Sequence, residues 1–300
     1  MVLNMNFSMG LKSILVTIFI LNISMSNNVN TDNGIIQQLN SITVMSYNIR
    51  FDNPDDGINA WPNRKEHVAD MIGTKYQGDI IGIQEAIIHQ IDDLQQQLPD
   101  YSWVGVGRDD GRDKGEFSPI FYRTDRFYLV VTNTFWLSKT PHQPGSKSWD
   151  AAITRVVTWA MFIDLKSNRS FYVINTHFDH IGEKARVESS KMIAEFVSEI
   201  EPDIPIIITG DLNVPETSEA YSVLSDHPQL HDARYLSESG HVGPTATFNN
   251  WSELRPPETR IDYIFVNNSI RVLNHKIADD QYEGYFPSDH LPVISEILFK

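Results

Sequence analysis

The chain has 300 residues, of which 41% are hydrophobic and 21% are charged, and its formal net charge at pH 7 is −15. This composition is typical of a folded globular protein and excludes extensive disorder. The acidic charge argues against tight, nonspecific binding of nucleic acid by the whole surface. The absence of cysteine excludes disulfides, thiolate zinc sites and cysteine nucleophiles.

The first 26 residues differ from the rest of the chain. Lys12 is their only charge, and the apolar run Ile14–Leu21 follows it, ahead of small and polar residues. This order predicts a signal peptide over residues 1–26, because the apolar run is too short for a good transmembrane helix. A retained N-terminal anchor is the alternative. The polar residues 27–40 read as a tether. We therefore expect a secreted or periplasmic protein whose mature chain is not inserted in a membrane.

The remaining residues, 41–300, alternate strand-like apolar runs with helix-like segments and contain no evident linker. Strands are predicted at 42–47, 79–83, 120–122, 128–136, 156–165, 171–176, 205–209, 261–266, 270–277 and 293–299. Helices are predicted at 64–75, 87–98 and 183–200. Too many strands follow one another through short turns for a single parallel sheet. The pattern favours an α/β fold in which two sheets pack face to face with helices outside.

Polar residues end the first two predicted strands. Asn48 follows the first strand and offers either a neutral oxygen ligand or an amide that orients a carboxylate, although turn formation is the commoner role of such an asparagine. Glu85 closes the second strand, where burial without a partner would be costly. A hard cation such as Mg²⁺ or Mn²⁺ is a natural partner for it. A glutamate in the first turn of a helix is the structural alternative.

The strands at 171–176 and 205–209 also end in polar residues. His177, Asp179 and His180 follow the first of these, and they are possible ligands of a zinc ion. Asp211 and Asn213 follow the second. Because residues at i and i+2 lie on the same side of an extended chain, both side chains are expected to face one pocket.

A fifth cluster precedes the last strand. Asp289 and His290 lie there, and Asp262 opens a neighbouring strand. Asp289 can bind a metal while His290 acts on a substrate. A buried aspartate can also fix the tautomer of a histidine and stabilise its charged form.

Two common hydrolase motifs are absent. The chain has no Gly-x-Ser-x-Gly, which argues against an α/β-hydrolase, and no Gly-x-x-x-x-Gly-Lys-Ser/Thr, which excludes a P-loop NTPase.

From Ile42 to Lys300 the chain resembles the endonuclease/exonuclease/phosphatase superfamily of metal-dependent phosphoesterases. The resemblance rests on six motifs in family order: Tyr47-Asn48-Ile49-Arg50, Ile83-Gln84-Glu85, Asn175-Thr176-His177, Gly210-Asp211-Leu212-Asn213, Arg260-Ile261-Asp262-Tyr263 and Ser288-Asp289-His290. It implies a four-layer α/β/β/α sandwich with two packed mixed sheets flanked by helices.

The resemblance also implies a role for each motif residue. The metal shell would comprise Asn48, Glu85 and Asp289, with Mg²⁺ or Mn²⁺ as the ion. The catalytic residues would comprise Asp211, which orients or deprotonates the attacking water, Asn213 at the phosphate, His290 held by Asp262, and the second histidine, His177. Which histidine is the acid stays open.

Other residues are candidates for substrate contacts. Arg155 is suited to clamp a phosphate, and Asp179 and His180 are expected to line the mouth of the pocket. Four aromatic residues in loop-like stretches could stack a base or a sugar, although local packing is their commoner role: Trp61, Trp149, Phe248 and Trp251.

The sequence thus predicts a secreted phosphodiesterase or phosphatase, monomeric, that acts on a small or short-chain phosphoester. The stretch Arg108–Lys114 mixes charges of both signs, and no basic run suits the tracking of a nucleic-acid backbone. A polynucleotide nuclease, either a deoxyribonuclease-like endonuclease or a deadenylase-like exonuclease, is the main alternative. A catalytically inactive binding module and a zinc hydrolase using His177, Asp179 and His180 are further alternatives.

Overall fold

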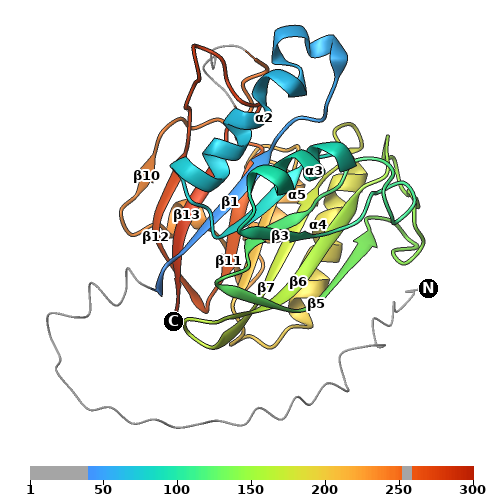
Figure 1. The fold of residues 1–300 in the computed structure, drawn as a ribbon. Coiled ribbons are helices and arrows are strands. Elements are labelled where there is room, and N and C mark those ends of the chain that lie inside the picture. The colour runs from blue at the N-terminus through green and yellow to red at the C-terminus, as the bar shows by residue number, and fades with distance from the viewer. Residues whose placement is uncertain (1–39, 252–258) are drawn as a thin grey trace, which may run out of the picture.

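The computed structural model describes residues 40–251 and 259–300, which form two mixed β-sheets flanked by helices (Figure 1). The predicted signal peptide (1–26) and all but the last residue of the predicted tether (27–40) lie outside the described residues. None of the helices in the described ranges is long and apolar enough to cross a membrane.

The first sheet has seven strands in the order β10-β12-β13-β1-β2-β4-β3. In that order they span His241–Val242, Ile270–Ile277, Val293–Phe299, Ile42–Asn48, Ile80–Gln84, Ile120–Arg123 and Tyr101–Val104. Strands β1 and β2 are parallel at its centre, and β13 runs antiparallel to β1.

The second sheet has six strands in the order β5-β6-β7-β8-β11-β9. In that order they span Phe127–Trp136, Val156–Asp164, Arg169–His177, Ile206–Asp211, Asp262–Asn267 and Leu230–Asp232. Here β7 and β8 are the parallel pair, and β11 runs antiparallel to β8. Each sheet thus has a parallel pair beside an antiparallel strand.

Helices cover the outer face of each sheet. The first sheet is covered by α2 (Trp61–Asp70), its π-helical extension η2 (Met71–Lys75) and α3 (Ile88–Gln97), and the second by α4 (Glu183–Ser198) and α5 (Glu219–Ser225). Two short helices, η1 (Pro54–Asn59) and α6 (Ala233–Leu236), lie in connections. The predicted four-layer α/β/β/α sandwich is confirmed.

Apolar residues alternate along the central strands and so build three separate cores. In β1, Val44 packs between the sheets while Met45 packs under the α2/α3 layer. In β8, Ile207 faces the space between the sheets while its neighbours Ile206 and Ile208 face α4 and α5. This period of two, applied to strands that are apolar on both faces, forces each sheet to be covered on both sides.

A buried polar contact links the two sheets near one end. Asn175 of β7 donates to the carbonyls of Ile83 and Pro119 at 2.7 and 2.8 Å and accepts from Gln84 at 2.7 Å. Gly82 lies directly opposite, because a Cβ there would fall 1.9 Å from Thr209 Oγ1. The absence of a side chain at Gly82 therefore sets how closely the sheets approach.

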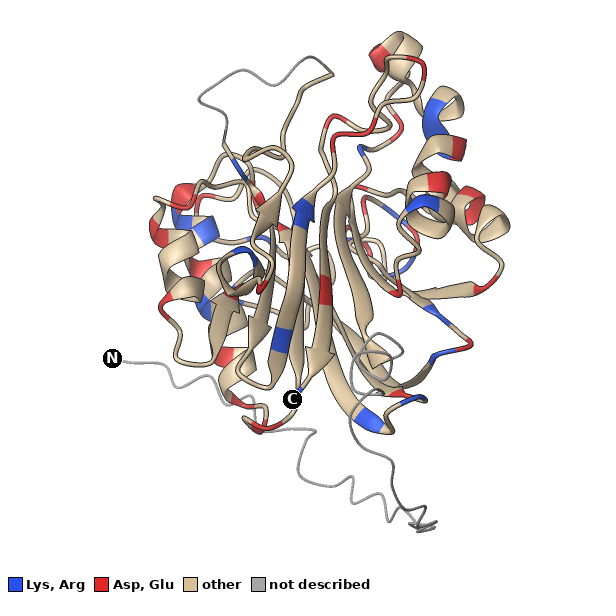
Figure 2. Cartoon of the chain, turned by 90° about the vertical axis from the view of Figure 1, so that its left-hand side faces the viewer, with Lys and Arg blue, Asp and Glu red and all other residues tan. Residues whose placement is uncertain are grey.

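Charged side chains lie mainly on the helices and loops, and the strands carry few of them (Figure 2). Several Asp and Glu residues fall in the loops at one end of the sheets. That end holds the candidate site.

Candidate active site

Strand direction brings the predicted residues together at one edge of the sandwich. The parallel strands β1, β7 and β8 end there at Asn48, His177 and Asp211, and the antiparallel strand β11 begins there at Asp262. Asp211 is the register partner of both His177 and Asp262. Strand pairing brings His177, Asp211 and Asp262 together within one sheet, and the packing of the two sheets adds Asn48.

A cavity of about 600 Å³ opens at this edge. It is lined by the predicted residues Glu85, Arg155, His177, His180, Asp211, Asn213, Asp289 and His290. The other lining residues are Arg50, Phe51, Asp56, Glu116, Ile153, Phe248, Asn250, Trp251 and Ile261. Asn48 and Asp262 lie behind the wall and support it.

The amide of Asn48 holds two carboxylates in place. Its Nδ2 donates to Glu85 Oε1 and to Asp211 Oδ2, both at 3.0 Å, while its Oδ1 accepts from the backbone N–H of Arg50 at 3.0 Å. The backbone contact fixes which way the amide points. Asn48 thus orients both carboxylates, which is one of the two roles that the sequence offered for it, and its role as a metal ligand stays a prediction.

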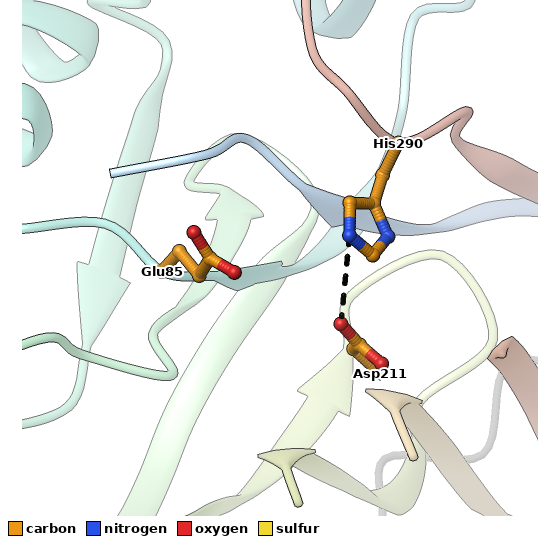
Figure 3. Close-up of side chains that lie close together, drawn as sticks. All are labelled: Glu85, Asp211 and His290. Atoms are coloured by element: carbon orange, nitrogen blue, oxygen red, sulfur yellow. Dashed lines mark ion pairs between the residues drawn. The ribbon is translucent and has the colours of Figure 1, made fainter. Parts of the chain in front are cut away.

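Three side chains converge closely enough to hold a cation (Figure 3). Glu85, Asp211 and His290 each offer an atom within 4.8 Å of the other two. Asp289 lines the same cavity but does not belong to this cluster. The donor set suits a hard divalent ion through its carboxylate oxygens.

Two buried carboxyl groups of the cavity have too little positive charge around them to keep their usual pKa values. Burial and the neighbouring Asp262 raise the pKa of Asp211 to about 7, and burial also raises the pKa of Asp289. Raised carboxyl pKa values in a cavity indicate that a positive charge would be stabilised there. Glu85 differs: the charge of His290 and a hydrogen bond from Asn48 outweigh burial and hold its pKa below the usual range.

His290 forms a buried pair with Asp262. The distance from His290 Nδ1 to Asp262 Oδ2 is 2.9 Å. Although burial disfavours the imidazolium, the charges of Asp262, Asp211 and Asp289 raise the pKa of His290 well above its usual value. The raised pKa suits His290 to donate a proton or hydrogen bond, and it leaves carboxylate oxygens as the better candidate ligands for a cation in this cavity.

His177 is held in the opposite state. Burial and the nearby guanidinium groups of Arg155 and Arg108 lower the pKa of His177 well below its usual value. Asn213 Nδ2 lies 2.9 Å from His177 Nε2 and also donates to the carbonyl of Phe178 at 3.0 Å, which fixes the amide orientation. His177 Nε2 is therefore an acceptor, and a neutral imidazole and an imidazolium face the same cavity.

Two further charged residues near His177, Glu116 and Arg108, had no clear signal in the sequence. Glu116 Oε2 lies 2.6 Å from Arg108, 3.6 Å from Arg155 and 4.0 Å from His177 Nδ1. Glu116 follows an irregular loop and not a strand, so the search for polar strand ends missed it. The Nε of Arg155 is buried without a hydrogen-bond partner, which leaves this predicted phosphate clamp a free donor.

Of the two remaining candidates for substrate contacts, one lines the cavity and the other is turned towards the backbone. His180 lines the cavity, whereas Asp179 is buried and its carboxylate accepts from the backbone N–H groups of Ile153, Ile181 and Gly182. Asp179 thus holds the loop after β7 instead of facing the pocket mouth, and a zinc site built on it has no free carboxylate.

The four aromatic candidates are divided in the same way. Phe248 and Trp251 line the cavity. Trp61 is buried and donates to Asp93 at 2.8 Å, and Trp149 packs against the core beneath α4.

Comparisons with known proteins agree with this geometry. Residues 45–290 match the model of the endonuclease/exonuclease/phosphatase family. A solved endonuclease/exonuclease/phosphatase from Bacteroides vulgatus is 36% identical, with a TM-score of 0.83 over 87% of this chain and 99% of that one. The mannosyl-6-phosphatase Bt3783 of Bacteroides thetaiotaomicron is 40% identical, with a TM-score of 0.82 over 86% of this chain and 100% of that one.

A more distant structure shares the fold. The structure of D. rerio TDP2 with a single-strand DNA product is 16% identical, with a TM-score of 0.67 over 86% of this chain and 98% of that one. The two solved Bacteroides structures are the more informative for the site.

Proposed function

The chain belongs to the endonuclease/exonuclease/phosphatase family, and we propose that it is a divalent-metal-dependent hydrolase of small phosphoesters, most specifically of a sugar phosphate. Members of this family hydrolyse phosphoesters. The observation that carries the proposal is the cavity in which Glu85, Asp211 and His290, which converge closely enough to hold a cation, meet the second histidine, His177.

Each group has a chemical task in such a reaction. Glu85, with Asp289 beside it in the cavity, would hold the cation, which supplies charge neutralisation on the phosphate oxygens. Asp211, whose pKa is raised to about 7, is suited to accept a proton from the attacking water near neutral pH. His290 carries a proton that it can share with the phosphate or the leaving group, and Asp262 stabilises that charge.

The other wall is suited to bind the phosphate. Asn213 and Arg155 line the cavity beside His177, and a guanidinium is well shaped to donate to an anionic oxygen. Neutral His177 accepts from Asn213 through Nε2 and so positions that amide beside the phosphate site. These groups bind and orient, which is most of what phosphoryl transfer requires from a protein.

Two observations favour a small substrate. The similar protein from Bacteroides thetaiotaomicron is a mannosyl-6-phosphatase. Only two of the lining residues, Arg50 and Arg155, carry a fixed positive charge, and each lies beside a carboxylate. A cavity of this charge offers little to the successive phosphates of a polymer.

A polynucleotide nuclease stays the second candidate, because the shared fold includes a protein solved with a single-strand DNA product. The test is a panel of hexose 6-phosphates, glycerol phosphate, a choline-type lipid, single-stranded RNA and DNA, and duplex DNA, each assayed with Mg²⁺, with Mn²⁺ and with EDTA. The proposal expects EDTA-sensitive phosphate release from small esters. Cleavage that is confined to the polymers would contradict it and establish the nuclease.

We also propose that the protein is exported and acts as a monomer. The apolar run behind Lys12 supports export. Mass spectrometry of the N-terminus after expression in a secreting host tests the signal peptide, and an intact Met1 on exported protein would contradict cleavage.

A further inference from the structure

Backbone strain is concentrated around the cavity. Nine described residues other than glycine have a positive φ, and five of them line the cavity: Arg50, Glu85, Asn213, Asn250 and Trp251. Left-handed backbone is unfavourable for residues with a Cβ and is uncommon for a bulky side chain such as tryptophan. Such strain persists only where the surroundings impose it, and it gathers at sites that must be preorganised.

Trp251 has the most unusual conformation of the five, with φ 61° directly after Asn250 at 49°. The loop is pinned to the segment that carries His290. The backbone N–H groups of Asn249 and Asn250 donate to the carbonyl of Asp289 at 2.8 and 3.2 Å, and the side chain of Asn249 accepts from the N–H of Trp251 at 2.8 Å. The indole is thus fixed relative to the catalytic histidine.

Arg64 supports Trp251 from behind. This buried guanidinium lies 5.4 Å from the centre of the Trp251 ring, and its own donors reach backbone carbonyls of two site loops. Those carbonyls belong to Ile49, Arg50, Asn59 and Pro287. Because Arg64 has no carboxylate partner within hydrogen-bonding reach in the described structure, its donors serve to hold these loops together around the ring.

A charged pair completes this side of the cavity. Arg50 donates from Nε and from its terminal nitrogen to the two oxygens of Asp56, both at 3.0 Å, and Asn53 donates to the same carboxylate at 3.0 Å. Arg50 and Asp56 line the cavity together with Trp251. A fixed donor beside a fixed acceptor matches a hydroxyl group, which donates and accepts at once.

We propose that Trp251, Arg50 and Asp56 form a preorganised subsite for the hexose ring of a phosphate monoester, an inference that rests on the proposed function. The indole covers an apolar face of the ring, and the charged pair binds its hydroxyls. Arg50 is already paired with Asp56, so this side of the cavity offers no uncompensated positive charge to a second phosphate. A neutral ring with hydroxyls therefore fits better than the next nucleotide of a polymer.

The test compares two phosphates of primary alcohols that differ in the ring, a hexose 6-phosphate and glycerol phosphate. Trp251→Ala should lower kcat/KM for the hexose ester about tenfold, chiefly through KM, because stacking on an aromatic ring is worth about that factor. Glycerol phosphate should change less than about twofold. Trp251→Phe should retain most of the preference, and Tyr128→Ala, which removes an exposed aromatic of β5, is the matched control.

A binding measurement separates this inference from the proposed function. Calorimetry with the Asp211→Asn variant and Mg²⁺, in which water activation is disabled, should show about tenfold tighter binding of the hexose ester than of glycerol phosphate. Adding Trp251→Ala should abolish the difference. Retained binding preference without turnover by the wild type would sink the hydrolase proposal and keep the subsite.

Three results would overturn the subsite. The first is turnover of both esters by the wild type with equal KM. The second is an equal loss on both esters in Trp251→Ala, which would make Trp251 a structural residue. The third is a loss that appears only for single-stranded oligonucleotides, which would assign the ring to a nucleobase.

Discussion

At the scale of single residues, the site separates two histidines into opposite states. Asp262 and its neighbours keep a proton on His290, while burial and two guanidinium groups keep His177 neutral. The sequence predicted both histidines but could not assign the state of His177, because it depends on burial and on the approach of Arg155 and Arg108. Arg108 lies in a loop and Arg155 directly before β6, and no local sequence pattern connects either of them with His177.

The first prediction concerns His290. His290→Ala should lower turnover by about 10² or more, since a positioned proton donor contributes a factor of that size. Circular dichroism should still show the native fold, although the thermal unfolding temperature should fall, because the truncation leaves the buried carboxylate of Asp262 without its partner. Asp262→Asn is the companion variant: it keeps the shape but removes the charge that stabilises the imidazolium, and should cause a comparable loss. Turnover at the wild-type rate in His290→Ala would refute the assigned role.

At the scale of strands and helices, most of the elements follow from the sequence. The predicted strands and the three predicted helices appear within a few residues of their expected bounds, because long apolar runs and helical spacing are strong local signals. Short elements were missed, including α5, β3, β9, α6 and β10. The cap of α5, where Ser218 accepts from the N–H of Tyr221 at 3.1 Å, is a signal that was available.

The local sequence pattern could not predict how closely the two sheets approach each other. Gly82 reads in the sequence as an ordinary glycine within a strand, yet it lies against Thr209 and Asn175 of the opposite sheet. Only the tertiary pairing reveals that contact, and it fixes how far Asn48 and Glu85 stand from Asp211.

The second prediction tests this contact. Gly82→Ala should lower the free energy of unfolding by about 1–3 kcal/mol, as expected for an overpacked core, and should also lower turnover because the sheets must separate. Chemical denaturation measures the first effect and phosphate release the second. Gly78→Ala is the comparison, because its Cβ would crowd Ile81 of the same sheet at 3.0 Å and no atom of the opposite sheet, so turnover should be retained. A fully stable and active Gly82→Ala would show that the contact has no such role.

The third prediction concerns the paired strands β10 and β12. His275 Nδ1 lies 2.9 Å from His241 Nδ1, and burial, with the charges of Arg260 and His241, lowers the pKa of His275 to about 3. The unfolded chain has a pKa near 6.5 at this position, so protonation favours unfolding. Stability from this group is complete above about pH 6.5 and should fall by about 1.4 kcal/mol per pH unit below it.

Denaturation curves between pH 7.5 and 4.5 measure this effect. His275→Asn should flatten that part of the profile relative to wild type, although its stability at pH 7.5 will be lower. A variant with an undiminished slope would place the acid sensitivity elsewhere in the molecule.

At the scale of the whole molecule, an acidic protein is expected to act on an anionic substrate. The net charge of −15 makes the long-range field unfavourable for phosphate, so the positive charge must be local. We propose that His290, Arg155 and a bound cation provide it within one cavity at the edge of the sandwich. The fold was predictable because its motifs recur in family order along the chain. The choice of substrate depends instead on the loops that carry Arg50 and Trp251.

The central claim is that this cavity performs metal-dependent phosphoester hydrolysis, and the most direct test is a Mg²⁺ titration of phosphate release from a hexose 6-phosphate after treatment with EDTA. We predict no release in EDTA, full recovery with Mg²⁺, and a higher Mg²⁺ concentration for half-maximal rate in Glu85→Gln. Release that persists in EDTA, or a titration that Glu85→Gln leaves unchanged, would contradict the account.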